Sequence, residues 1–299
     1  MLFILLQTSY SEANSLWQKA NLAGLDYLIY VPTHIDTKPL SLMINLHGCG
    51  QHAKDLANLG NWEVAAEDSR MIVVLPDVPN GGVVMGCWDY YGKNHTETNR
   101  HNGPLIELTE SLIKMENLNI NTNHVFISGL SSGAGEAAIL GCLRPDLFSG
   151  VALNSGPALG TTQNDLYLPT ITSDEIAEQC NKLAGSRSIH FLKQITSIMV
   201  SDKDLIVNPQ HSALSFEAIQ KIYGLAGATE FDLTKLKGTN TQGIGLSIQD
   251  KQNQIRISFI TNHALGHAFP SGKGTGPVEH YINPFSINYP AYLGNLFKR

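Results

Sequence analysis

The feature that most constrains the fold of this chain is a regular alternation of strand-like runs with helix-like segments. The strand-like runs cover residues 27–31, 42–46, 71–75, 125–128, 151–154, 195–200 and 255–260. Several of them are apolar without interruption, which is the pattern of strands buried on both faces. The helix-like segments between them cover residues 53–59, 62–68, 105–116, 132–143, 173–183 and 209–223. This order predicts an α/β fold, with a mostly parallel, doubly wound sheet and helices on both of its faces.

The domain organisation follows from length and composition. A chain of 299 residues allows one large α/β domain or two small ones. No repeat, low-complexity tract or charge block divides it, and the polar stretch 228–243 is interpreted as a surface excursion rather than a linker. We therefore expect a single domain over residues 14–299. Residues 1–13 resemble the end of a secretory signal peptide, although a basic start is missing, and a plain N-terminal strand is the alternative.

Charge and cysteine content exclude several classes of partner. A net charge of -6 and the lack of a long basic run argue against a nucleic-acid surface. No segment approaches the roughly 20 apolar residues of a membrane span. No CxxC motif or clustered Cys/His pair is present, so we expect no metal. Cysteines stand at positions 49, 87, 142 and 180, which fits two disulfides in an oxidising compartment or, alternatively, four buried thiols.

The stretch 124–138, HVFISGLSSGAGEAA, places a serine between glycines where a predicted strand ends and a predicted helix begins. In a doubly wound sheet, functional groups gather at the carboxyl ends of the strands. Gly-x-Ser-x-Gly at such a point is typical of a nucleophile elbow, in which Ser131 projects above the sheet. The amide of Ser132, in the first turn of the helix, can then bind an oxyanion. The alternative is an incidental glycine turn.

An elbow serine needs a histidine as base and an acid that orients it, in the chain order serine, acid, histidine. The run ITSIMVSDKDLIVNP ends a predicted strand with two candidate acids, Asp202 and Asp204. The last predicted strand is followed by His263 and His267, with His280 as a remote third candidate. The strand pattern separates neither pair of alternatives.

A second oxyanion donor usually comes from the loop after an early strand. The segment LMINLHGCGQ, residues 42–51, supplies such a loop, because Gly48 and Gly50 let the backbone turn its N–H groups inward. We expect the amide of Cys49 to be this donor.

Several separated motifs then agree with one family. They are LHGCGQ (46–51), CWDYY (87–91), GLSSGA (129–134), D-x-x-V (204–207), GHAFPSG (266–272) and INYPAYLGNLF (287–297). Over nearly its whole length the chain resembles the extracellular polyhydroxybutyrate (PHB) depolymerase and feruloyl esterase family of α/β-hydrolases. The resemblance implies the α/β-hydrolase fold and a chemistry that needs no metal or organic cofactor.

The resemblance also assigns site residues. It implies a catalytic triad of Ser131, Asp204 and His267, and it is what favours Asp204 over Asp202 and His267 over His263. It places the oxyanion donors at Cys49 and Ser132. Two aromatic residues, Trp88 and Phe269, correspond to positions at the substrate cleft, and the alternative for each is a place in the core. Phe269 stands where family members often have tryptophan, and Ala134 where they often have a second glycine.

These inferences predict a secreted or periplasmic serine carboxylesterase acting through an acyl-enzyme. The expected substrate is a short-chain 3-hydroxyalkanoate polyester or its oligomers, and the closing INYPAYL stretch resembles the depolymerases most. The alternative substrate is a feruloyl or acetyl ester on plant polysaccharide. A more distant alternative is a non-catalytic α/β-hydrolase that binds a ligand. No obligate protein partner is implied.

The parallel sheet also suggests how the cysteines pair. Cys49 and Cys87 lie in loops that leave neighbouring strands at their carboxyl ends, so they are expected to form a disulfide. Cys142 and Cys180 are the remaining pair. Cys142 is on the predicted helix after the elbow, and nothing local shows that Cys180 faces it.

Overall fold

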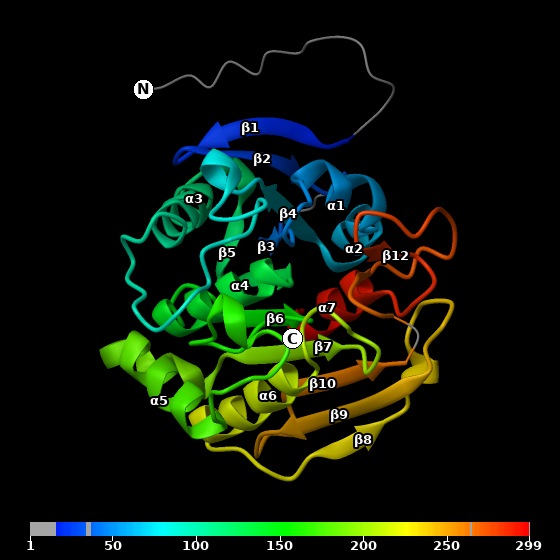
Figure 1. The fold of residues 1–299 in the computed structure, drawn as a ribbon. Coiled ribbons are helices and arrows are strands. Elements are labelled where there is room, and N and C mark those ends of the chain that lie inside the picture. The colour runs from blue at the N-terminus through cyan, green and yellow to red at the C-terminus, as the bar shows by residue number, and fades with distance from the viewer. Residues whose placement is uncertain (1–15, 34–36, 264, 299) are drawn as a thin grey trace.

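A mostly parallel sheet forms the centre of the molecule (Figure 1). The computed structural model describes residues 16–33, 37–263 and 265–298, so the expected signal remnant at 1–13 lies outside the described residues. The strand order is β1-β2-β4-β3-β5-β6-β7-β10-β9-β8. The parallel strands in the middle are β4 (Met71–Pro76), β3 (Leu40–Leu46), β5 (Ile120–Leu130), β6 (Gly150–Asn154), β7 (Ile195–Val200) and β10 (Ile255–Asn262). The predicted doubly wound sheet is therefore confirmed.

Antiparallel strands complete both ends of this sheet, and of these only β2 was predicted, as the run 27–31. One end pairs β2 (Leu25–Tyr30) with β1 (Gln18–Leu22), and the other adds β9 (Gly243–Gln249) and β8 (Thr229–Phe231). The stretch 228–243 is thus more than a surface excursion, because it contributes an edge strand. Glycines interrupt the apolar pattern of β9, which is why the pattern does not predict this strand. Glycine is needed at position 245, because a Cβ there would lie 2.7 Å from the Phe231 ring.

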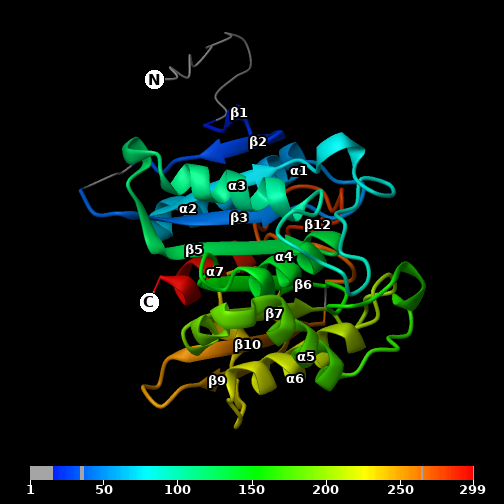
Figure 2. The ribbon, with the colours of Figure 1, turned by 90° about the vertical axis from the view of Figure 1, so that its left-hand side faces the viewer.

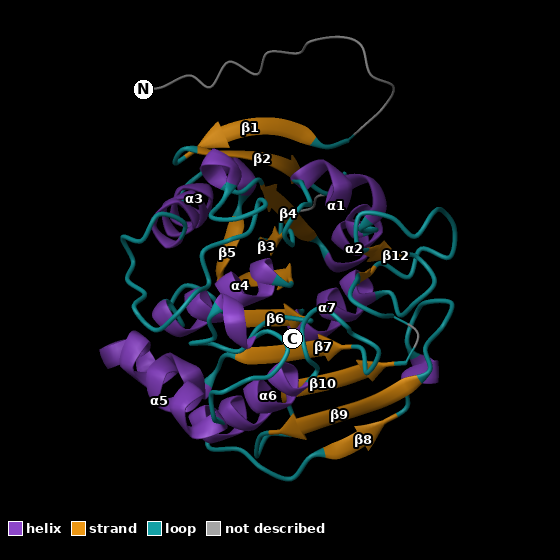
Figure 3. Ribbon diagram, viewed as in Figure 1, coloured by secondary structure: helices purple, strands orange, loops and turns teal. Residues whose placement is uncertain are grey.

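Helices cover both faces of the sheet, as the purple ribbons in Figure 3 show. On one face lie α1 (Ala53–Leu59), α2 (Trp62–Ser69) and α7 (Tyr289–Phe297). On the other face, toward the viewer in Figure 2, lie α3 (Asn102–Ile113), α4 (Ser132–Leu143), α5 (Ser173–Ala184) and α6 (Gln210–Tyr223). Consecutive residues of one strand pack into cores on opposite faces of the sheet, as Met43 and Ile44 of β3 do. The uninterrupted apolar runs therefore reflect burial on both faces.

Asparagine side chains mark the beginning of two helices. The last helix, α7, was not predicted, although Asn288 caps it by accepting a hydrogen bond from the Ala291 N–H at 3.0 Å. The helix α6 begins at Gln210, one residue later than expected, and the Asn208 side chain accepts from the Gln210 N–H. Short 3-10 helices are Pro79–Gly81, Glu116–Leu118, Gln163–Asp165, Gly185–Leu192 and Leu233–Lys235.

All the parallel strands end at the same edge of the sheet, on the right-hand side of Figure 2. The connections 47–52, 77–101, 155–172, 201–209 and 263–288 therefore meet there. The last of them contains a small parallel pair, β11 (Phe269–Pro270) and β12 (Ile282–Asn283). None of the helices that the structure describes has the length and apolar character needed to span a bilayer.

Candidate active site

Ser131 occupies the sharp turn between β5 and α4. Its backbone is left-handed, with φ 55° and ψ -119°, a conformation that costs roughly 1–3 kcal/mol in a non-glycine residue. The flanking glycines permit the turn: a Cβ on Gly129 would lie 2.4 Å from Gly133, and one on Gly133 would lie 2.5 Å from the His47 carbonyl oxygen. The Ser131 N–H donates to the Asn154 carbonyl at the end of β6, at 2.9 Å. The sequence-predicted elbow geometry is therefore present.

Asp204 and His267 form a hydrogen-bonded acid–histidine pair. Nδ1 of His267 lies 2.7 Å from Oδ2 of Asp204, and their side chains are 8% and 0% exposed. The other carboxylate oxygen of Asp204 accepts from the N–H groups of Ile206 and Val207 at 2.9 and 3.0 Å. Burial raises the pKa of this carboxyl, but the contact with His267 and the two amides outweigh burial and hold the pKa below its ordinary value. The carboxylate therefore stays ionised and fixes the ring.

Asp202 and His263, the alternatives that the strand pattern left open, contact each other. Nδ1 of His263 lies 2.9 Å from Oδ2 of Asp202, and both side chains are solvent-exposed. Between the two pairs, the Gly266 N–H donates to the Ser201 hydroxyl at 3.0 Å. The connections after β7 and β10 are thus joined by a buried acid–histidine pair, an exposed one, and a hydrogen bond from a backbone N–H to a hydroxyl.

One residue, Asn154, links the serine turn to the histidine segment. Asn154 accepts from the Ser131 N–H through its carbonyl, and its side-chain amide donates to the carbonyl of Ala268 at 3.2 Å. Among the described residues, no hydrogen bond joins the Ser131 hydroxyl to His267. Catalytic hydrogen bonds of this kind are often made only in the complex with substrate.

The loop 47–51 after β3 passes close to the serine. A Cβ on Gly48 would lie 3.4 Å from the Ser131 Cβ, so glycine allows this approach. The Gly48 N–H donates to Oε1 of Gln51 at 2.6 Å, and the Gln51 amide donates to the His280 carbonyl. In the part of the chain that the structure describes, the N–H groups of Cys49 and Ser132 have no protein acceptor. Both predicted oxyanion donors are therefore free to bind a ligand.

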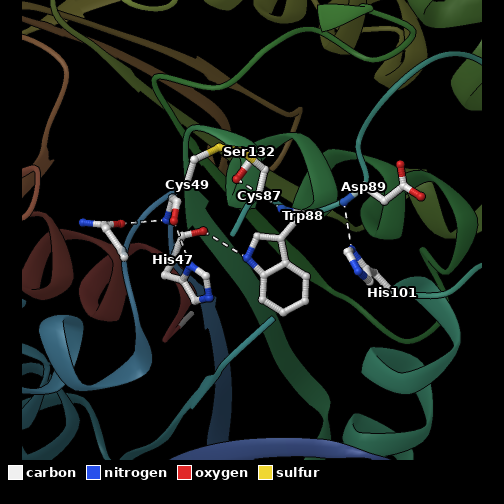
Figure 4. The surroundings of a disulfide bond; sticks show 9 residues. His47, Cys49, Cys87, Trp88, Asp89, His101 and Ser132 are labelled. Atoms are coloured by element: carbon white, nitrogen blue, oxygen red, sulfur yellow. Dashed lines mark hydrogen bonds between the residues drawn. A yellow bond between two sulfur atoms is a disulfide. The ribbon is translucent and has the colours of Figure 1, made fainter. Parts of the chain in front are cut away.

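Trp88 does not line a cleft, which corrects the sequence-based assignment. It is 0% exposed and packs in the core below the loop 47–51, which we call the oxyanion loop after its predicted role (Figure 4). Its indole N–H donates to the His47 carbonyl at 3.0 Å, and its backbone N–H donates to the Ser132 hydroxyl at 3.4 Å. Trp88 therefore supports the loop and the helix that carry the candidate oxyanion donors. Its buried ring has no face left for a substrate.

Phe269 is also buried, although it lies two residues from His267. Its ring packs against Trp62 of α2 with centroids 5.9 Å apart, and its backbone pairs with Ile282 of β12. The aromatic side chain is directed into the core by the β11–β12 pairing. The assignment of Phe269 to the substrate cleft is therefore wrong in this structure.

His47 is a buried, neutral residue beneath the same loop. Burial lowers its pKa. Nε2 accepts from the Val78 N–H at 3.1 Å, so the ring proton is on Nδ1, which donates to the Gly48 carbonyl at 2.7 Å. Sequence analysis did not assign His47, Gln51 or Asn154 a role. Gln51 lies in the quoted LHGCGQ motif, whereas the cross-loop contact of Asn154 leaves no local signal.

Two disulfides are present, with the pairings predicted from the sequence. Cys49 joins Cys87, which connects the oxyanion loop to the residue before Trp88 (Figure 4). Cys142 of α4 joins Cys180 of α5. Within residues 16–33, 37–263 and 265–298, no three His, Cys, Asp or Glu side chains are grouped so that they could hold a metal.

A strained serine between strand and helix, at the carboxyl edge of a parallel sheet, defines the molecule as an α/β-hydrolase in fold. Residues 25–172 match the family described as Esterase PHB depolymerase. This match confirms, for that part of the chain, the resemblance predicted from the motifs.

Individual relatives agree with this placement. The chain is 30% identical to a poly(3-hydroxybutyrate) depolymerase of Ralstonia pickettii, over 91% of this chain and 57% of that protein. The chain thus spans little more than half of that relative. It is 28% identical to feruloyl esterase B of Thermothelomyces thermophilus, over 79% of this chain and 88% of the relative.

A solved structure supports the fold. An acetyl xylan esterase from Aspergillus awamori has a TM-score of 0.67 and 18% identity, and the match covers 84% of this chain and 93% of that one. At this identity the likeness concerns the fold alone. It confirms the α/β-hydrolase architecture that the sequence predicted.

Proposed function

We propose that this chain is a serine carboxylesterase that hydrolyses a short-chain 3-hydroxyalkanoate polyester or its oligomers. The observation that carries the proposal is the buried Asp204–His267 pair, which stands at the same sheet edge as the strained Ser131 turn. The polyester is suggested by the name of the Ralstonia pickettii relative and by the family of residues 25–172. The catalytic unit is proposed to be a single domain over residues 14–299.

In the proposed mechanism, the hydroxyl oxygen of Ser131 attacks the ester carbonyl while Nε2 of His267 takes the hydroxyl proton. Asp204 accepts from Nδ1 and stabilises the imidazolium that forms. The tetrahedral oxyanion binds the N–H groups of Cys49 and Ser132. His267 then returns the proton to the alcohol oxygen, which leaves. Water attacks the acyl-Ser131 ester in the same way and releases the acid.

The proposed location is outside the cytoplasm, either extracellular or periplasmic. Both cysteine pairs are oxidised, and disulfides form and persist in oxidising compartments. The two disulfides would also stabilise an enzyme that acts on a polymeric substrate outside the cell.

A feruloyl or acetyl ester on plant polysaccharide is the second candidate substrate. It is favoured by the similarity to feruloyl esterase B, which covers more of the relative than the match to the depolymerase does. Clearing of a PHB film and release of ferulate from methyl ferulate, measured with the same purified protein, distinguish the two. Film clearing without ferulate release supports the first candidate, and the reverse supports the second.

Hydrolysis of p-nitrophenyl butyrate by the wild type and by Ser131→Ala tests the enzyme class itself. A triad serine contributes about 10⁴-fold or more to turnover, so the variant should lose nearly all activity and keep its fold. Near-wild-type activity of the variant would exclude the elbow serine as nucleophile. A wild type without activity would favour a non-catalytic binding protein.

A further inference from the structure

Trp88 and Phe269 are buried, but one aromatic side chain beside His267 is exposed to solvent. Tyr281 is 50% exposed, and its ring meets the His267 ring edge-on, with centroids 6.0 Å apart and planes at 77°. No other aromatic ring of the described residues has a recorded ring contact with His267. Tyr281 therefore borders the base of the proposed triad and presents a free face to solvent.

The backbone around Tyr281 is strained. His280 and Tyr281 both have left-handed backbones, with φ 46° and 52°. The Ile282 N–H donates to the Glu279 carbonyl at 2.8 Å, so these two residues form the centre of a turn with the type I′ pattern. Such turns prefer Asn-Gly, because a side chain opposes positive φ. Histidine and tyrosine are therefore poor choices for the turn itself.

Two contacts fix the turn to the candidate site. The Tyr281 carbonyl accepts from the Phe269 N–H at 2.7 Å, two residues from His267. The His280 carbonyl accepts from the Gln51 amide, whose oxygen binds the Gly48 N–H of the oxyanion loop. The turn is thus tied on one side to the histidine segment and on the other side to the oxyanion loop.

The position beside His267 indicates which half of an ester Tyr281 would meet. In the proposed mechanism His267 returns its proton to the leaving alcohol oxygen, so the alcohol half must lie against the imidazole. A ring that packs edge-on against that imidazole is placed to meet the alcohol half, whereas the acyl half is bonded to Ser131. We propose that Tyr281 is a specificity-determining residue that binds the alcohol portion of the ester, which in a polyester is the next hydroxyacid unit.

This inference rests on the proposed esterase function and deepens it. A pair of butyrate esters tests it, because benzyl butyrate and ethyl butyrate share the acyl group and differ only in the alcohol. Tyr281→Gly should lower kcat/KM about tenfold on benzyl butyrate, through KM, and by less than about twofold on ethyl butyrate. Tyr281→Phe keeps the ring and should restore benzyl butyrate hydrolysis to near the wild-type level.

The Tyr281→Gly variant also separates a role of Tyr281 in substrate binding from a purely structural role. It suits the left-handed backbone, so Tyr281→Gly should unfold at the same temperature as the wild type or higher. Phe285→Ala, which removes an exposed aromatic ring from the same connection, is the matched control and should leave the ester preference unchanged. Equal losses on both esters, or a loss that follows acyl length, would overturn the assignment. Ser131→Ala keeping its activity would instead overturn the esterase function.

Discussion

His267 and Asp204 are joined by a 2.7 Å hydrogen bond between Nδ1 and Oδ2, while two residues before Asp204 a second acid, Asp202, binds His263 at 2.9 Å. The two pairs have the same chemistry and differ in burial. The inner pair is almost closed to solvent and the outer pair is exposed. Since a dry environment strengthens an acid–imidazolium interaction, the inner pair is the one suited to catalysis.

Asparagine substitutions at the two acids should therefore have unequal effects. Asp204→Asn removes the charge that holds His267 and should lower kcat by about 10³–10⁴-fold. Asp202→Asn, made in the exposed pair, should lower kcat by less than about tenfold. Rates of p-nitrophenyl butyrate hydrolysis by the two purified variants check this, and a larger loss in Asp202→Asn would show that the acid is misassigned.

Gln51 should act as a positioning residue for the oxyanion loop. Gln51→Met keeps the buried volume but removes the bonds to the Gly48 N–H and the His280 carbonyl. We expect kcat to fall about tenfold or more, because misplacing an oxyanion donor weakens transition-state binding.

The matched control for Gln51→Met is Gln179→Met in α5. Gln179 is also a buried glutamine, and its side-chain amide has no hydrogen-bond partner among the described residues. The control should keep its kcat. If both variants fold and both keep wild-type kcat, the loop does not depend on Gln51.

The two disulfides offer a comparison with loop length held constant, because each spans a sequence separation of 38. Replacing either pair by alanine should lower the free energy of unfolding by roughly 3–4 kcal/mol, measured by urea denaturation. Only the Cys49→Ala/Cys87→Ala double variant should also lose turnover, because that bridge holds the candidate oxyanion loop. Equal kcat values in the two double variants would contradict a role for the bridge in positioning.

Glu136 of α4 should make stability depend on pH. The side chain is fully buried without a hydrogen-bond partner among the described residues, and burial, followed by the charge of Asp89, raises its pKa well above the ordinary value of 4.5. The folded protein thus holds a proton that the unfolded chain has released. The contribution of Glu136 to the free energy of unfolding is therefore greatest below pH 4.5 and is lost as the pH rises through the folded-state pKa.

Glu136→Gln cannot ionise and should remove this fall. The free energy of unfolding of the variant should exceed that of the wild type by about 1 kcal/mol or more at pH 8, and the difference should shrink toward pH 5. Urea unfolding at both pH values measures it. Glu116→Gln, at an exposed position, is the control. A difference that does not change with pH would mean that Glu136 is not protonated in the folded state.

The sequence predicted the parts of the fold that depend on local pattern. The helices 53–59 and 132–143 and most of the buried strands were recovered with their observed bounds or nearly so, because apolar periodicity records burial directly. Of β5, only part of the buried half was predicted, as the run 125–128. The outer strands β1, β8 and β9 escaped, because β1 and β8 are short and largely solvent-exposed and β9 includes two glycines. The elbow at Ser131 was visible because its glycines are required by contacts of 2.4–2.5 Å.

Candidate substrate-binding residues could not be predicted in the same way. Trp88, Phe269 and Tyr281 are all aromatic, and residue type does not tell a buried ring from an exposed one. Burial of Trp88 is decided by contacts with His47, which is 41 residues away in the chain, and exposure of Tyr281 by a turn that Gln51 anchors. Such contacts exist only once the sheet has assembled.

The adjacency of β7 and β10 in the sheet has a consequence for how this protein can be altered. The acid follows one strand and the histidine follows the other, yet α6, β8 and β9 lie between those strands in the chain. Because the parallel pairing of β7 with β10 fixes both ends of this intervening segment, its length does not set the distance between acid and base. The segment is therefore a natural insertion point, where added sequence would change the outer surface of the molecule and leave the Asp204–His267 contact in register.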